Sequence, residues 1–159
     1  DSGAIYVMYS DDLTVWTYPK KLFDPGYPVI DGTIFVMDGK YWMIYKDERE
    51  GAKTIYSACT QDLSLTFRKA YDWKYLQKER PVEGPMVFQD ISSGAYHLYA
   101  DHYSDHTFLC GMFTGLDYDH EIDWSDTERV VLPEEDVRHG SVIIVTRKEY
   151  DRLKEAYGE

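Results

Sequence analysis

The sequence is poor in cysteine, in basic residues and in long apolar runs. Only two of its 159 residues are cysteines; Cys59 and Cys110 fall at non-equivalent positions of the repeat described below, so we expect free thiols. No run of about 18 apolar residues occurs, so no transmembrane helix is expected. With 17 Lys and Arg against 29 Asp and Glu, the net charge is −12. That balance leaves no basic surface for nucleic acid or for an anionic membrane, and we expect neither as a partner.

Several catalytic signatures are also missing. The sequence contains no Ser or Cys nucleophile motif, no phosphate-binding glycine loop and no dinucleotide fingerprint. A function must therefore be sought in other patterns.

The sequence does contain an internal repeat. An ionisable residue, then glycine, then a small residue or proline and an apolar run occur three times, starting at Asp31, Glu83 and His139. The starts lie roughly 50 residues apart, a period typical of the four-stranded blades of β-propellers. The repeat predicts that these three residues occupy equivalent positions in successive units and converge on one axis.

The apolar runs of the repeat read as buried strands. Residues 33–37, 86–88 and 142–145 are nearly continuous apolar stretches, as in strands covered on both faces. Asp38-Gly39 predicts a tight hairpin, and residues 91–94 predict a longer version of the same turn. Aromatic residues make up 16% of the chain, which suits β structure and sugar binding alike, and we expect most of them to pack in the core.

The end of the chain follows a helical pattern. Thr146 and Glu149 have the spacing of a capping box, which predicts a helix over residues 147–157. Its apolar residues share one face: Tyr150, Leu153 and Tyr157. We expect this short helix to dock on the last blade.

These features predict an all-β fold, the C-terminal portion of a single β-propeller domain. The expected parts are the end of one blade (1–24), two blades (31–73 and 83–131), a closing strand (138–146) and the helix (147–157). A propeller needs at least about four blades to close. We therefore expect the chain to partner the N-terminal remainder of the propeller or another chain.

Four segments carry a resemblance to a known family: residues 30–34, 45–48, 83–85 and 138–142. In order and approximate spacing they resemble the C-terminal half of glycoside hydrolase family 43, and the resemblance covers essentially the whole chain. That family includes β-xylosidases, α-L-arabinofuranosidases and arabinanases on a five-bladed propeller. The resemblance implies a hydrolase that cleaves arabinose- or xylose-containing oligosaccharides or polysaccharides by single-displacement inversion.

The resemblance also implies residue roles. Glu83 matches the general acid, and Asp31 matches the carboxylate that orients and tunes it. His139 matches the axial histidine that contacts calcium in many members, so calcium is the expected cofactor and His139 its contact. The general base lies in the family's first blade, for which this sequence has no matching segment. Gly32 stands where alanine is more usual.

Three further residues are candidates for substrate binding. Arg138, beside His139, is suited to bind a sugar hydroxyl or to pair with an acid, and Trp42 is suited to stack on a sugar ring or to pack in the core. Asp101 opens the segment 101–106, which is rich in metal-ligand residue types. We expect this segment to be a solvated loop that borders the sugar site. Residues 46–48 occupy the same place in the earlier unit and are a further candidate for a substrate contact.

Other functions stay open at this stage. One is a propeller that binds carbohydrate without cleaving it, with the acids serving as hydrogen-bond acceptors. Another is a protein-interaction propeller, although the signatures of WD and kelch repeats are missing. The retaining fructosidases share the five-bladed architecture but carry cysteine after the acid, where this chain has Gly84.

A fragment of this kind is expected to be inactive by itself. Half a propeller exposes apolar strand faces and lacks the base that activates water. Residues 1–159 expressed alone should aggregate or melt without cooperativity, and should not hydrolyse arabinosides or xylosides. Mass, melting and turnover measurements test this, and a folded, active monomer would contradict it.

Overall fold

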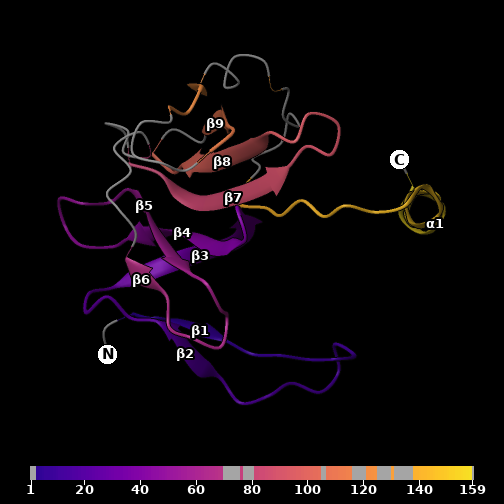
Figure 1. Ribbon diagram of the computed structural model, residues 1–159. Coiled ribbons are helices and arrows are strands. Elements are labelled where there is room, and N and C mark those ends of the chain that lie inside the picture. The colour runs from indigo at the N-terminus through magenta and orange to yellow at the C-terminus, as the bar shows by residue number, and fades with distance from the viewer. Residues whose placement is uncertain are drawn as a thin grey trace.

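The structure is a computed structural model that describes residues 3–69, 76, 81–104, 107–115, 121–124, 130 and 138–158. Within these ranges the chain forms three antiparallel sheets and a C-terminal helix (Figure 1). The all-β fold class is confirmed, and the architecture is consistent with a portion of a β-propeller. The predicted blade ends at residues 73 and 131 lie outside the described residues.

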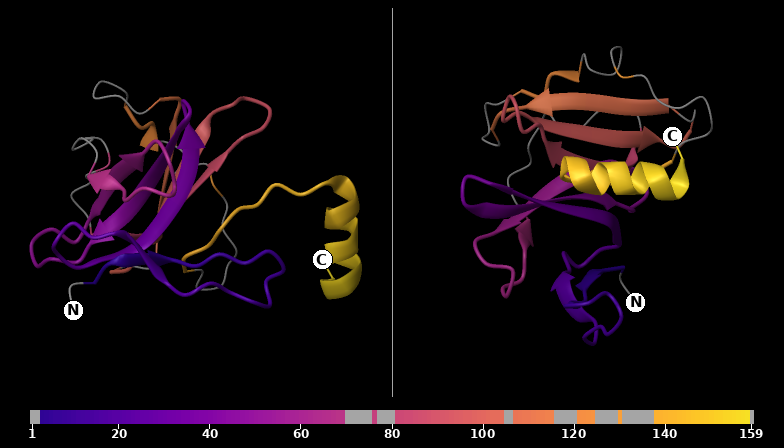
Figure 2. Two further views of the ribbon diagram at one scale, coloured as in Figure 1. Left: turned by 60° about the horizontal axis from the view of Figure 1, so that its bottom comes forward. Right: turned by 90° about the vertical axis from the view of Figure 1, so that its right-hand side faces the viewer.

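Each sheet is built from strands that are consecutive in the chain. The first pairs β1 (Ile5–Val7) with β2 (Lys20–Phe23). The second has the order β3 (Val29–Met37), β4 (Lys40–Asp47), β5 (Ile55–Thr60) and β6 (Arg68–Lys69). The third has the order β7 (Glu83–Gln89), β8 (Tyr96–His102) and β9 (Thr107–Phe113). The sheets follow one another through the molecule, as successive blades do (Figures 1 and 2).

The tight hairpin at Asp38 and Gly39 is confirmed. Asp38 has a φ of 50° and Gly39 a φ of 70°, the positive values that a primed two-residue turn requires. The turn connects Met37 directly to its pairing partner Lys40. The longer turn that precedes β8 also ends on a positive φ, 73° at Gly94.

Two apolar clusters lie on either side of the second sheet. One is shared with the first sheet and includes Phe23 and Tyr45, whose ring centroids are 4.8 Å apart. The other joins the second and third sheets, where Tyr96 stacks on Phe113 at 5.4 Å and donates a hydrogen bond to the carbonyl of Val36 at 2.7 Å. Cys59 and Cys110 are thiols and do not form a disulfide, as predicted.

The C-terminal helix forms as predicted but does not dock. α1 spans Arg147–Tyr157, and its capping box is present: Glu149 N donates to Thr146 Oγ1 (3.3 Å), and Thr146 N donates to Glu149 Oε2 (2.8 Å). None of its residues is buried, and it stands apart from the sheets (Figures 1 and 2). The expectation that it packs on the last blade is therefore wrong. The capping box and the Arg147–Asp151 ion pair (2.9 Å) stabilise it locally instead.

The segment before the helix is extended. Residues 138–146 pair with no strand in the described part of the chain, so the closing strand stays a prediction. Val142, Ile143 and Ile144 are exposed along it. Within the described ranges, α1 is too short and too polar to cross a membrane.

The cluster between the second and third sheets should carry much of the stability. Leu98 on β8 is fully buried in it, and Leu98→Ala removes buried methyl groups and leaves a cavity. We expect the free energy of unfolding to fall by about 2–5 kcal/mol. Leu65→Ala, at a leucine that is 57% exposed, is the control and should change it by less than about 0.5 kcal/mol. Chemical denaturation of both variants of the complete protein measures this, and equal effects would contradict the assignment of the core.

Candidate active site

The repeated motif contains a backbone irregularity in β3 and another in β7. In β3 the pairing register shifts between Ile30 and Thr33, and in β7 it shifts between Glu83 and Met86. Such β-bulges bend a strand and redirect its side chains, and they are frequent beside active sites. The motif therefore changes the direction of the chain at the place where its ionisable residues lie.

The register also shows which residues of the two motifs correspond. Ile30 lies opposite Lys46, and Glu83 lies opposite Asp101. Both pairs come directly before the bulge. Ile30 and Glu83 are therefore structurally equivalent, and so are the residues that follow them.

Asp31 and Gly84 are those following residues. Both have a φ of 55°, and His139 also has a positive φ of 21°. This left-handed conformation favours glycine, and Asp and His adopt it more readily than most residues. The prediction that Asp31, Glu83 and His139 are equivalent is therefore wrong by one residue at Glu83. A one-residue step along a strand sends a side chain to the other face, so Glu83 and Asp31 point to different surroundings.

The three motifs do meet in space. They surround a hollow of about 200 Å³, lined by Asp31, Gly32, Thr33, Gly84, Pro85, His139, Gly140 and Ser141. Glu83, one residue before Gly84, is not among the residues that line it. Gly84 N donates to Asp31 Oδ2 at 3.0 Å, which joins the first two motifs. The His139 ring covers Gly84 so closely that a Cβ there would lie 2.6 Å from His139 Cδ2. Only glycine fits at this position without displacing the ring.

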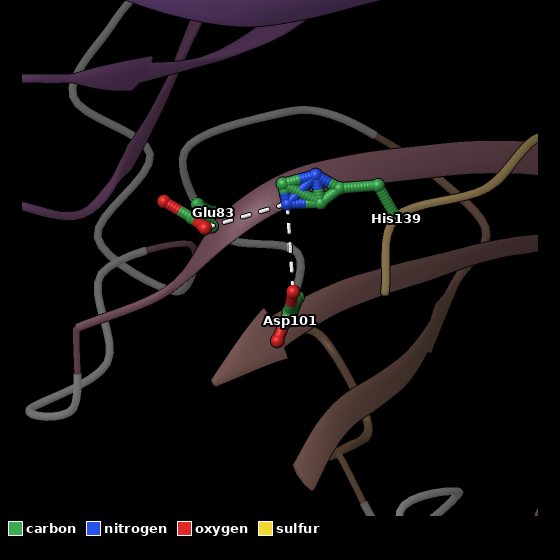
Figure 3. Close-up of side chains that lie close together, drawn as sticks. All are labelled: Glu83, Asp101 and His139. Atoms are coloured by element: carbon green, nitrogen blue, oxygen red, sulfur yellow. Dashed lines mark ion pairs between the residues drawn. The ribbon is translucent and has the colours of Figure 1, made fainter. Parts of the chain in front are cut away.

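Glu83 lies between two cations. Lys46 Nζ donates to its Oε2 at 2.6 Å, and Arg138 Nη2 donates to its Oε1 at 2.7 Å. His139 Nε2 is 3.4 Å from the same Oε1, and Figure 3 shows the imidazole pointing toward Glu83 and Asp101. The Glu83 side chain is 16% exposed. The carboxylate that the resemblance implies as the general acid is thus mostly buried, and both of its oxygens accept hydrogen bonds from cations.

Asp101 lies beside this group but is not in a loop. It belongs to β8, and its side chain is completely buried. Its Oδ2 accepts from Arg138 Nε and lies 3.4 Å from His139 Nε2, while its Oδ1 is buried without a hydrogen-bond partner among the described residues. The expectation of a solvated loop is therefore wrong for Asp101 and His102, which are buried strand residues; residues 105 and 106 lie outside the described residues.

The charges form a chain of alternating sign. It runs through ion pairs of 2.9 Å or less and consists, in spatial order, of Lys53, Glu48, Lys46, Glu83, Arg138 and Asp101. Burial lowers the pKa of Lys46, but the hydrogen bonds that it donates to Glu48 and Glu83 outweigh that effect and raise it overall. The hydrogen bonds from Lys46 and Lys53 lower the pKa of Glu48, and the bond to Asp101 raises the pKa of Arg138. Each charge in the chain therefore stabilises its neighbours.

A calcium ion has potential ligands here, but the arrangement suits it poorly. Ligand atoms of Glu83, Asp101 and His139 lie within 4.8 Å of one another, and the unpartnered Asp101 Oδ1 is a vacant acceptor. Calcium, however, takes six to eight oxygens, and Arg138 and Lys46 already bind three of the four carboxylate oxygens. A calcium contact at His139 stays a prediction of the resemblance, and the described side chains supply positive charge in its place.

Two of the candidates for substrate binding, Arg138 and Trp42, contact other parts of the protein. Arg138 binds two acids, one of the two alternatives that its sequence context left open. Trp42 packs against the cluster between the second and third sheets, and its indole nitrogen is buried without a hydrogen-bond partner. Sequence reasoning missed Lys46 as a partner of Glu83. The only available signal was its place in the segment that resembles the family.

Comparison with known families bears on this geometry. A family model described as a probable glycosyl hydrolase domain, related to family 43, matches residues 1–151. The chain belongs to this family. No curated protein matches the chain. Family membership supports a glycosyl hydrolase in general.

The ion chain predicts a pH-dependent contribution of Glu48 to stability. Because the pKa of Glu48 is lowered from its ordinary 4.5, its contribution is complete above that value and is lost as the pH falls through the lowered one. At pH 7, Glu48→Gln should reduce the free energy of unfolding by about 1 kcal/mol, and the difference from wild type should disappear in acid. Chemical denaturation of the complete protein at several pH values measures this free energy. The Glu50→Gln variant, at an exposed residue, is the control. A difference that persists below both pKa values would contradict the ionic origin.

Proposed function

We propose that this chain carries the acid half of an inverting glycosidase site. Its substrates are arabinose- or xylose-containing oligosaccharides or polysaccharides, Glu83 is the general acid, and Asp31 is the carboxylate that orients it. The observation that carries the proposal is the meeting of the three motifs around one hollow, which Gly84 lines directly after Glu83, in a chain of a glycosyl hydrolase family. The activity belongs to the complete protein, in which the general base comes from outside these motifs.

The chemistry assigns a task to each side chain. In single displacement an acid protonates the leaving oxygen while a base, about 6.5–9.5 Å away, activates water on the opposite side of the ring. Asp31 binds the backbone N–H of Gly84 and so fixes the chain directly after Glu83. The His139 ring, against Gly84, closes the same turn.

Glu83 must carry a proton to act as the acid, so one of its two cations must give way. Arg138 is suited to do so, because its side chain is 41% exposed and its Nε also binds the buried Asp101. Asp101 has no exposed surface and therefore acts through Arg138. The direct sugar contact is assigned to Arg138, and the stacking role of Trp42 stays a prediction.

One observation favours a second candidate, a domain that binds carbohydrate without cleaving it. Both oxygens of Glu83 accept hydrogen bonds from cations, which is the arrangement of a hydrogen-bond acceptor and not of a proton donor. Hydrolysis separates the two candidates, since only the enzyme turns over substrate.

Glu83→Gln tests the general-acid role in the complete protein. Loss of a positioned proton donor costs about 10²–10⁴ in rate on substrates with poor leaving groups. Activated aryl glycosides, which need no protonation to leave, should be largely spared. The measurement is kcat/KM for matched alkyl and nitrophenyl arabinosides and xylosides, with melting as a check on folding and the exposed Glu121→Gln as control.

Two outcomes would count against the proposal. An equal loss on both substrate types, with folding intact, would remove Glu83 from the acid role. Binding of the sugar by wild-type protein without any turnover would favour the second candidate.

A further inference from the structure

We infer that Lys46 is a positioning residue that holds the Glu83 carboxylate in place across the boundary between the second and third sheets. The inference rests on the proposed function, in which Glu83 is the general acid. Lys46 stands near the end of β4, and Glu83 is the first residue of β7. Their 2.6 Å ion pair therefore links two different sheets.

The surroundings of Lys46 fix the direction of its ammonium group. The side chain is 4% exposed, and Nζ is 2.6 Å from Glu83 Oε2 and 2.7 Å from Glu48 Oε1. It also lies 4.3 Å from the centroid of the Tyr103 ring, within the range of a cation–π contact. An ammonium group has three N–H bonds, so two carboxylates and one ring account for its surroundings. Lys46 has little freedom to move, unlike the exposed Arg138.

Glu48 competes with Glu83 for the same ammonium group. It binds Lys46 through Oε1 and Lys53 through Oε2, at 2.7 and 2.9 Å. Removing the charge of Glu48 leaves Lys46 to Glu83 alone, whereas removing the charge of Lys46 leaves Glu83 with Arg138 alone. The two substitutions therefore change the field at Glu83 in opposite directions.

Different effects on activity follow from these contacts. In Lys46→Met the Glu83 carboxylate keeps only its bond to the exposed Arg138, so the proposed acid is no longer held in one position, and a misplaced catalytic group costs rate. In Glu48→Gln the Lys46–Glu83 ion pair remains, so the acid stays in place and activity should change little.

The test is kcat and KM in the complete protein, for wild type, Lys46→Met, Lys46→Arg and Glu48→Gln, on a nitrophenyl glycoside and an alkyl glycoside. Lys46→Met should lose about 10-fold or more in kcat on the alkyl glycoside, whose leaving group needs the proton, and much less on the nitrophenyl glycoside. Lys46→Arg keeps the positive charge and should recover part of that loss. Lys53→Met is the matched control: it removes the same charge from the same ion chain, but from a residue that pairs with Glu48 and not with Glu83. Its kcat should stay close to that of wild type on both substrates.

A purely structural role would lower the yield or the melting temperature and would affect both substrates alike. A folded Lys46→Met variant that loses activity equally on both substrates, or not at all, would overturn the inference. If Lys46→Met does not fold, Lys46→Arg decides alone: a loss on the alkyl glycoside only, absent from Lys53→Met, supports the inference, and equal losses on both substrates or none overturn it.

Failure of the proposed function gives a different result. If Glu83→Gln keeps full activity on poor leaving groups, the acid assignment is wrong whatever Lys46 does. If Glu83→Gln behaves as a lost acid while the Lys46 variants keep wild-type activity on the alkyl glycoside, only the positioning role fails.

Discussion

The pairing of buried charges is the constraint on which this structure depends. Lys46 and Asp101 are buried in the second and third sheets, and an uncompensated buried charge costs several kcal/mol. Each therefore needs a partner of opposite sign, and Glu83 and Arg138 provide them. Because Glu83 also binds Arg138, the two requirements merge into one chain of ion pairs. The same contacts thus hold the sheets together and shape the candidate site.

The backbone at the motif starts divides the site into two environments. Asp31 and His139, in the left-handed conformation, line the hollow. Glu83 and Arg138, one residue earlier in their motifs, pair with each other and with the buried charges. A single step along the strand therefore separates the residues that line the hollow from those that pair with the buried charges, and the bulge makes that step possible.

The sequence predicted what local chemistry decides. Asp38-Gly39 specifies its hairpin, and Thr146 with Glu149 specifies the start of α1, because each depends on neighbours a few residues away. The period of the repeat located the motif starts only to within one residue, since the bulge changes the register inside the motif. The partners of Glu83 could not be predicted from the sequence, because Lys46 and Arg138 lie 37 and 55 residues away from it along the chain. The position of α1 could not be predicted either, since an apolar stripe shows that a helix can pack against another surface but does not show which one.

The consecutive order of the strands has a consequence for biosynthesis. Every sheet pairs neighbours in the chain, and such local contacts close with little loss of entropy and form early. A sheet can therefore assemble while the next one is still being translated. The ion chain cannot, because it needs β4, β7 and β8 together with Arg138. As a nascent chain grows, its scaffold accordingly forms blade by blade, while its site comes into being in one late step, when Arg138 and His139 leave the ribosome.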